Sequence, residues 1–146
     1  MKVIVTTPDT VEWVAKQTNS SGNFGVCQGI GIKEGDRFIA GVVYNDFNGI
    51  CINAHMASDK SKRWMTRGFL WLIFYYPFEQ LGVERVTIGY GEKNWEAGRL
   101  NRHLGFTKEA ILERAHPDGR LIVCRMFKEE CKWLRLGKRY EQKMAA

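Results

Sequence analysis

Alternating hydrophobic and polar residues mark the first half of the chain as a set of β-strands. Period-two alternation is typical of strands that bury one face. It predicts strands over 24–33, 37–44 and 50–57. Turn residues separate the three segments, so we expect an antiparallel meander. Three glycines in the first segment leave room for another element to approach closely: Gly25, Gly29 and Gly31.

The pattern then changes to one typical of helices. Residues 60–81 combine strong helix formers with a nearly continuous apolar run, which predicts a helix buried on most of its surface. Pro77 is expected to kink or break this helix, and Leu81-Gly82 to end it. Further elements are predicted downstream: a strand over 84–90, a helix over 94–104 ended by Gly105, and a hairpin formed by 106–115 and 120–127.

A strand over 2–6 and a short helix beginning at Asp9 or Thr10 precede the meander. The predicted order is therefore β-α-β-β-β-α-β-α-β-β. A strand–helix–strand unit after an antiparallel meander predicts one α/β (α+β) domain over 1–146, with a single mixed sheet flanked by helices on both faces. Residues 128–146 form a basic tail that is expected to be helical.

Length and composition fit this single domain. A chain of 146 residues with 45% hydrophobic and 26% charged residues is ordinary for a soluble globular protein. The apolar stretch from Phe69 to Phe78 is about half as long as a bilayer-spanning helix. The N-terminus lacks the pattern of a signal peptide. We therefore expect a cytoplasmic protein that does not insert into a membrane.

The net charge indicates the kind of partner, and the spacing of the cysteines and histidines bears on disulfides and metal sites. A net charge of +6 favours an anionic partner, and both nucleic acid and the phosphates of a nucleotide cofactor remain open from composition. The four cysteines are scattered without a CxxC pair, and the three histidines are dispersed. This spacing predicts neither a disulfide framework nor a metal site.

Three motifs in the second half of the chain carry a resemblance to a known family. Arg63-Trp64-Met65-Thr66-Arg67-Gly68 matches Q/R-x-x-G-x-G/A at its first and last positions, with Thr66 in place of the middle glycine. The other two are Asn94 followed by Leu104-Gly105-Phe106, and Arg114 followed by Asp118-Gly119-Arg120. In this order the motifs resemble the GNAT superfamily of N-acyltransferases, especially small members encoded by bacteriophages and prophages. The resemblance covers roughly 24–127.

This resemblance implies an acetyl-CoA site at the start of the central helix. Unpaired N–H groups and the helix dipole make a helix N-terminus suited to a pyrophosphate, and Lys62 adds positive charge. The basic residues here also have a simpler interpretation, as a solvated first turn. In the family, the backbone of the preceding strand binds the reacting oxygen. The predicted cofactor-binding residues are Met56, Ala57, Ser58, Arg63, Trp64, Met65, Thr66, Arg67, Gly68, Asn94 and Asn101.

Members of the family often use a Glu on that strand as base and a Tyr on the later helix as acid. Neither is present, and Asn101 occupies the Tyr position. The candidate catalytic residues are His55, which titrates near neutrality, and Glu92, just past a strand. Each also has a structural interpretation, His55 as a hydrogen-bonded strand residue and Glu92 as a solvated loop carboxylate.

Three functions remain open from the sequence. The first is an acetyl-CoA-dependent N-acetyltransferase acting on an amine of a protein, peptide or small molecule. The second is a GNAT-fold binding module without activity, in a virion or a host-directed complex. A protein that binds or modifies nucleic acid through its basic surface is less favoured. Cys131 and Trp133 are expected to dock the tail on the body or on a second subunit, and a homodimer stays open.

Overall fold

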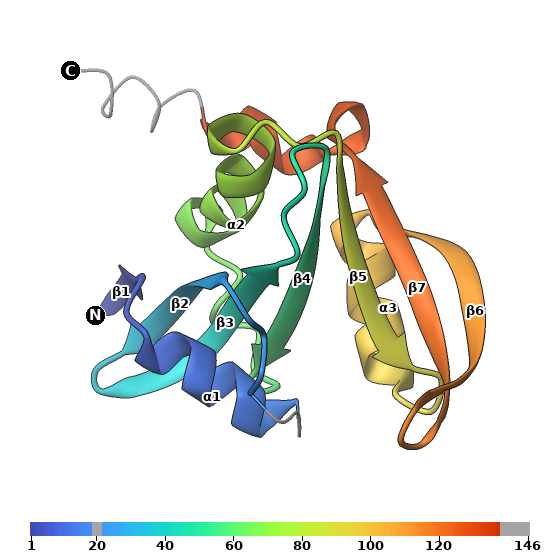
Figure 1. The fold of residues 1–146 in the computed structure, drawn as a ribbon. Helices are drawn as coiled ribbons and strands as arrows, with labels where there is room; N and C mark the ends of the chain where they lie inside the picture. The colour runs from blue at the N-terminus through green and yellow to red at the C-terminus, as the bar shows by residue number, and fades with distance from the viewer. Residues whose placement is uncertain (19–21, 138–146) are drawn as a thin grey trace.

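The computed structural model describes residues 1–18 and 22–137. The elements follow in the order β1 (Lys2–Val5), α1 (Asp9–Gln17), β2 (Cys27–Glu34), β3 (Arg37–Asn45), β4 (Cys51–Ser58), α2 (Arg67–Tyr75), a π-helical segment (Tyr76–Gln80), β5 (Arg85–Gly91), α3 (Trp95–Leu104), β6 (Thr107–His116), β7 (Gly119–Phe127) and two 3-10 segments (Lys128–Glu130 and Lys132–Gly137). The described strands form one sheet in the order β1-β2-β3-β4-β5-β7-β6. Only the β4–β5 pair within it is parallel. The predicted mixed sheet with helices on both faces is confirmed (Figure 1).

Helix α1 packs closely on the first half of the sheet because glycines of β2 and β3 lie beneath it. A Cβ added at Gly31 would lie 3.0 Å from Thr10 Oγ1, and one added at Gly41 would lie 2.8 Å from Val14 Cγ2. Thr10 and Val14 are fully buried in this contact. The predicted close approach is confirmed for Gly29 and Gly31, whereas Gly25 has no neighbour within 4 Å of its added Cβ.

The main core lies on the other face, under α2 and α3. Its largest fully buried side chains include Trp64, Phe69 and Phe78. This placement follows from the apolar run in the sequence, since a helix without a polar face is stable only when most of its surface is covered.

The predicted start of the central helix at residue 60 is wrong, because α2 begins at Arg67. Local side-chain bonds hold the preceding residues in turns: Asp59 accepts hydrogen bonds from both the backbone N–H and the hydroxyl of Ser61, at 3.0 and 2.6 Å. Thr66 then caps the helix by accepting from Phe69 N–H at 3.2 Å. Short polar side chains compete in this way with helical hydrogen bonds, so the strong helix formers of this stretch do not decide its structure.

The end of the helix agrees with the prediction. Pro77 has no N–H to donate to the carbonyl of Ile73, and the α-helix gives way to the π-helical segment there. The buried hydroxyl of Tyr44 donates to that carbonyl instead. Leu81 N–H closes the segment on the Tyr76 carbonyl at 3.0 Å, and Gly82 follows with a φ of 73°.

The two strands in the middle of the sheet separate along their length. Parallel pairing of β4 and β5 runs only from Cys51 with Arg85 to Ala54 with Ile88. Four further residues of β4 continue beyond Ala54, and Figure 1 shows the two strands diverging there. We call this opening between the unpaired ends of β4 and β5 the β4–β5 gap.

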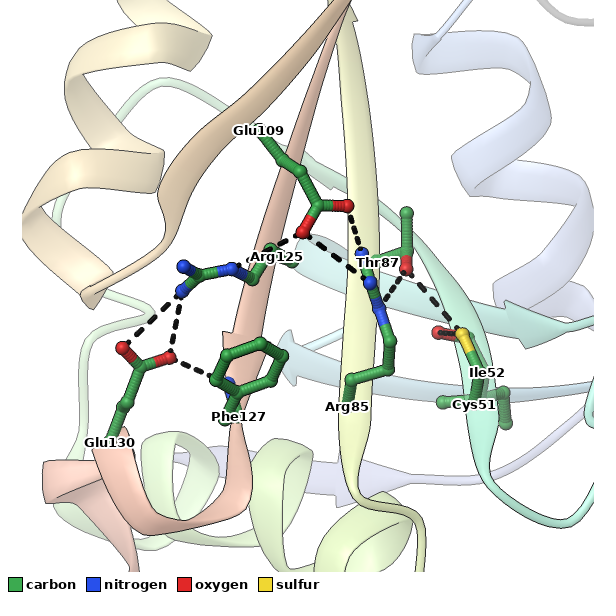
Figure 2. A network of polar contacts seen from close by, with 8 residues as sticks. All are labelled: Cys51, Ile52, Arg85, Thr87, Glu109, Arg125, Phe127 and Glu130. Carbon is green, nitrogen blue, oxygen red and sulfur yellow. Dashed lines mark hydrogen bonds and ion pairs between the residues drawn. The ribbon is translucent and has the colours of Figure 1, made fainter.

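A polar network ties β5, β6 and β7 together on the face opposite α3 (Figure 2). Arg85 Nη2 lies 2.7 Å from Glu109 Oε1, and Arg125 contacts both Glu109 and Glu130, at 3.3 and 3.0 Å. Arg85 precedes the buried Val86 on β5, so strand alternation directs the network away from the core. The two arginines and two glutamates balance in charge, which indicates a structural role.

The part of the predicted helical tail that the structure describes forms two short 3-10 segments, over 128–130 and 132–137. Residues 138–146 lie outside the described residues. Cys131 is buried, and the Trp133 indole N–H donates to the Leu104 carbonyl at 2.7 Å, so docking of these two residues on the body is confirmed. No helix within the described ranges is long and apolar enough to cross a membrane.

Candidate active site

The β4–β5 gap exposes backbone groups that a paired strand would use. The Ile50 carbonyl accepts from Glu84 N–H at 2.8 Å on the β5 side, whereas Asp59 N–H donates to Ile39 on β3 at 2.9 Å. Backbone groups alternate in direction along a strand, so even-numbered positions of β4 face β5. Met56 lies two positions past the last pair, and its N–H is therefore directed into the gap. The Ala57 N–H faces β3, which corrects its prediction as a donor in this site.

The N-terminus of α2 keeps two free backbone donors. Met65 N–H and Thr66 N–H bond within the turn, to the Lys62 and Trp64 carbonyls at 3.2 and 2.7 Å. Within the described chain, no hydrogen bond satisfies the N–H groups of Arg67 and Gly68. These two donors lie at the positive end of the helix dipole and are suited to an anion.

The side chains around this helix start fall into two groups. Arg63 pairs with Glu34 and, at 3.7 Å, with Asp59, so its charge is already partly neutralised. Lys62 and Arg67 are exposed and make no ion pair within the described ranges. The free positive charge at the site therefore belongs to Lys62 and Arg67 rather than to the predicted Arg63.

Two predicted contact residues of the motif serve the core instead. Trp64 is only 1% exposed and packs edge-on against Phe69, with ring centroids 6.2 Å apart. Met65 is half-buried and packs against the same core. The buried Trp64 side chain therefore belongs to the core, because an amphipathic turn must bury its apolar residues to hold the helix start in place. Cofactor binding by these two residues stays a prediction. Ser58 Oγ caps the following turn by accepting from Lys60 N–H at 3.2 Å.

His55 is half-buried at the first position of β4 that no longer pairs with β5. Its Nε2 lies 2.9 Å from Asn45 Oδ1, and its ring contacts that of Phe24 with centroids 4.9 Å apart. Desolvation by burial lowers the pKa of His55, partly offset by the charge of Asp46. A lowered pKa keeps the imidazole neutral at pH 7, which is the form that can accept a proton.

Glu92 is held in an ion pair with Arg120. The Arg120 Nε lies 2.7 Å from Glu92 Oε2, and the Arg120 backbone N–H donates to Oε1 at 3.3 Å. These hydrogen bonds hold the pKa of Glu92 below its ordinary value. A carboxylate stabilised in this way is a weaker base, which supports the structural interpretation of Glu92. Its catalytic role stays a prediction.

The two predicted asparagines of α3 stabilise the helix itself. Asn94 Oδ1 accepts from Ala97 N–H at 3.2 Å as the N-cap. Asn101 is 5% exposed, and its carbonyl accepts from Gly105 and Phe106 at 3.1 and 2.9 Å. Gly105 has a φ of 106° and ends the helix as predicted. Placement thus gives Asn94 and Asn101 structural roles, and their binding of a cofactor stays a prediction.

Tyr90 is the residue of the gap that the sequence prediction missed. The parallel register pairs Ala54 with Ile88, so its continuation places Met56 opposite Tyr90. The Tyr90 hydroxyl packs against α3, where a Cβ added at Gly98 would lie 2.8 Å from it. Desolvation by burial raises the pKa of Tyr90. Strand alternation identified the face that Tyr90 occupies, but only the parallel register places it across from Met56.

Comparisons by sequence and by structure gave different outcomes. No protein-family model matches the chain, and no curated protein matches it by sequence. Solved structures do resemble it. A spermidine/spermine N-acetyltransferase of Vibrio cholerae is 11% identical, with a TM-score of 0.70 over 92% of this chain and 98% of that one. A GNAT family acetyltransferase of Elizabethkingia anophelis with acetyl-CoA bound is 13% identical, with a TM-score of 0.69 over 86% and 97%.

The chain has the fold of the GNAT acetyltransferases. A third similar structure is the ribosomal-protein-S5-alanine acetyltransferase of Vibrio fischeri, 14% identical with a TM-score of 0.60 over 73% of this chain and 64% of that one. At such low identity the likeness establishes the fold, and activity must be argued from the residues at the site.

Proposed function

We propose that the protein is an N-acetyltransferase that takes the acetyl group of acetyl-CoA and transfers it to a primary amine. The observation that carries this proposal is the β4–β5 gap, into which the Met56 N–H is directed beyond the last strand pair. The His55 side chain flanks the gap on the α1 face of the sheet, and the Tyr90 side chain flanks it on the α3 face. An acyl transfer needs an oxyanion donor, a proton acceptor for the amine and a proton donor for the leaving thiolate. The three groups match these needs.

The chain offers a fitting place for the phosphates of acetyl-CoA. Free N–H groups of Arg67 and Gly68 and the unpaired charges of Lys62 and Arg67 converge on one helix start. The apolar cavity between the sheet and the helices has a volume of about 20 Å³, which is too small for a cofactor. The cofactor would therefore lie along the open gap and the α2 N-terminus, and would supply the activated acetyl group.

The residues of the chain have distinct tasks in this proposal. Met56 N–H stabilises negative charge on the thioester oxygen. Neutral His55 accepts the proton that the amine loses as the new N–C bond forms. Tyr90 O–H donates a proton to the thiolate released as the C–S bond breaks. Positioning of the two substrates supplies much of the remaining rate.

The first test is a thermal-shift titration with acetyl-CoA, with adenosine diphosphate as the control. A ligand that binds only the native state raises the free energy of unfolding by about 2.7 kcal/mol at one hundred times its dissociation constant. We expect a saturable shift with acetyl-CoA that adenosine diphosphate does not reproduce. No shift at millimolar acetyl-CoA would overturn the proposed cofactor site.

A matched pair of variants tests where the phosphates bind. Gly68→Glu adds bulk and negative charge beside the free N–H groups of α2 and is expected to abolish most of the shift. Gly68→Ala keeps the N–H and the helix and is expected to retain it. Unchanged acetyl-CoA affinity in folded Gly68→Glu would remove α2 as the phosphate site.

A second candidate function is a GNAT-fold binding module without activity. The ion-paired Glu92 and the structural Asn101 favour it, because neither replaces the acid–base residues of the family. Saturable acetyl-CoA binding without acetylation in a panel of amines would select this alternative. The amine is unidentified; spermidine is the first choice for the panel because a similar structure is a spermidine N-acetyltransferase.

Three further expectations stay predictions. Nucleic-acid binding through the basic surface would appear as affinity that falls steeply with salt, and base preference would be needed to make it functional. One similar spermidine N-acetyltransferase structure is dodecameric, and sedimentation would measure whether this chain forms a dimer or a larger assembly. Kinship to bacteriophage-encoded members also stays a prediction.

A further inference from the structure

A buried asparagine connects His55 to the segment before β2. Asn45 is 9% exposed at the end of β3, and its amide lies between two partners. Its Nδ2 donates to the Phe24 carbonyl at 3.1 Å, and its Oδ1 lies 2.9 Å from His55 Nε2. The contact with His55 is diagonal across the strands, since the register pairs Val43 with His55.

The first of these bonds decides the chemistry of the second. A backbone carbonyl can only accept, so the Asn45 nitrogen must be the atom that faces Phe24. Asn45 therefore presents its oxygen, an acceptor, to His55. The His55 nitrogen at that contact must then carry a proton, which places the neutral ring in the Nε2–H tautomer. The Nδ1 atom keeps its lone pair and has no hydrogen-bond partner within the described chain.

The ring is held in this orientation from several sides. The Phe24 ring contacts it at an interplanar angle of 49°, and the Phe24 side chain is buried in the cluster that α1 covers with Val14 and Ala15. Neither α1 residue ionises. Two titratable groups lie near the pair of Asn45 and His55. Asp46 follows β3 and acts on the ring by its charge, and Cys27 of β2 pairs with Asn45 of β3.

We propose that Asn45 is a positioning residue that fixes His55 in the Nε2–H tautomer, so that Nδ1 is the atom that takes the proton from the acceptor amine. The inference rests on the proposed function. As the amine nitrogen bonds to the acetyl carbon, its proton passes to Nδ1; the C–S bond breaks, and the imidazolium later releases the proton to water. Asn45 takes no part in the bond changes and acts only through the ring it orients.

The test combines nuclear magnetic resonance of the imidazole nitrogens with kinetics. In the wild-type protein, long-range ¹H–¹⁵N correlations are expected to show His55 as the Nε2–H tautomer above its pKa. Asn45→Ala is expected to give a mixture of tautomers and to lower kcat at least about tenfold, with the KM for acetyl-CoA unchanged. The matched control is Gln28→Ala, a half-buried amide of β2 that does not contact His55.

A second variant gives a readout that a purely structural role would not move. Asn45→Asp keeps the size of the side chain and places a carboxylate beside Nε2, which stabilises the imidazolium. The acid limb of kcat/KM and the His55 pKa measured by resonance are both expected to move upward by about one pH unit or more. This variant also decides the matter if Asn45→Ala does not fold.

Several results would overturn the inference. These are an Nδ1–H tautomer in the wild-type protein, wild-type kcat in folded Asn45→Ala, or an unmoved acid limb in Asn45→Asp. If the wild-type protein turns over no amine, the proposed function fails, and the tautomer measured in the same sample still decides whether Asn45 orients His55.

Discussion

Tyr44 and Thr66 each satisfy a backbone group that the central helix cannot satisfy by itself. The Tyr44 hydroxyl reaches the Ile73 carbonyl that Pro77 leaves without a donor, and Thr66 Oγ1 accepts from Phe69 N–H in the first turn. Thr66 stands where the family motif has a glycine, yet its side chain is engaged in capping. At the residue scale, the departure from the motif stabilises the helix start and leaves the N–H groups of Arg67 and Gly68 free.

Tyr90 is the residue whose role is most directly tested by one substitution. Tyr90→Phe removes only the hydroxyl, which packs against α3 beside the gap, so the proposed proton donor for the thiolate is lost. We expect kcat to fall about a hundredfold, at the low end of general acid–base contributions, with the KM for acetyl-CoA little changed. The measurement is steady-state kinetics with the best amine of the panel.

Tyr75→Phe is the control, because its hydroxyl makes no hydrogen bond in the part of the chain that the structure describes. Turnover of Tyr90→Phe equal to that of the control would show that the thiolate leaves without help from Tyr90. A free thiol has a pKa of about 8.5, so a thiolate that leaves without a proton donor is the natural competing outcome.

At the scale of elements, the close packing of α1 on the sheet depends on glycines, which have no side chain. Gly31 and Gly41 lie on neighbouring strands, paired in register, and Thr10 and Val14 fill the space above them. The helix therefore lies closer to the sheet than ordinary side chains would permit. In this position α1 also covers the hydrophobic cluster that contains Phe24, and Phe24 in turn contacts the His55 ring.

A larger side chain at Gly41 should displace α1 from the sheet. Gly41→Val adds a branched side chain where the first added carbon would already lie 2.8 Å from Val14 Cγ2. We expect the free energy of unfolding to fall by roughly 1–3 kcal/mol through overpacking, with a smaller loss for Gly41→Ala. Urea denaturation measures both. A Gly41→Val protein as stable as the wild type would mean that α1 can move away from the sheet without cost.

At the scale of the whole molecule, two halves of the sheet meet through four parallel pairs of β4 and β5. Because the parallel pairing is short, the β4–β5 gap opens beyond it. In the second half of the sheet, ion pairs balance the charges of the arginines and glutamates. Hydrogen bonds from Arg120 and Arg85 hold the pKa values of Glu92 and Glu109 below the ordinary value of 4.5. Ionised carboxylates therefore stabilise the native state.

Acid should weaken the molecule accordingly. A carboxyl group whose pKa is lower in the native than in the unfolded state stabilises the protein above the unfolded value, and this stabilisation is lost as the pH falls. We expect the free energy of unfolding to drop below about pH 4.5, and the difference between the wild type and Glu109→Gln to shrink there. Denaturant titrations at pH 7 and at about pH 3 would test it. A constant difference at both pH values would contradict the assignment.

Prediction from the sequence succeeded where structure depends on nearby residues. The strands, the end of α3 at Gly105 and the break at Pro77 follow from alternation and from backbone restrictions of single residues. The predicted start of the helix at residue 60 failed because side-chain bonds of Asp59 and Ser61 outcompete helix propensity. Packing decided the kind of helix in the tail, since residues 132–137 lie against α2 as a 3-10 segment.

The sequence by itself determined the order of elements and the mixed sheet, and it predicted an anion site near the start of the central helix, although it misplaced the first residue of that helix. Only the tertiary structure decided which groups border the gap. Asn45 meets His55 diagonally across two strands, and Tyr90 faces Met56 through a parallel register between distant segments. Such contacts depend on strand register and on the packing of elements far apart in the chain, and periodicity along the sequence carries no information about either.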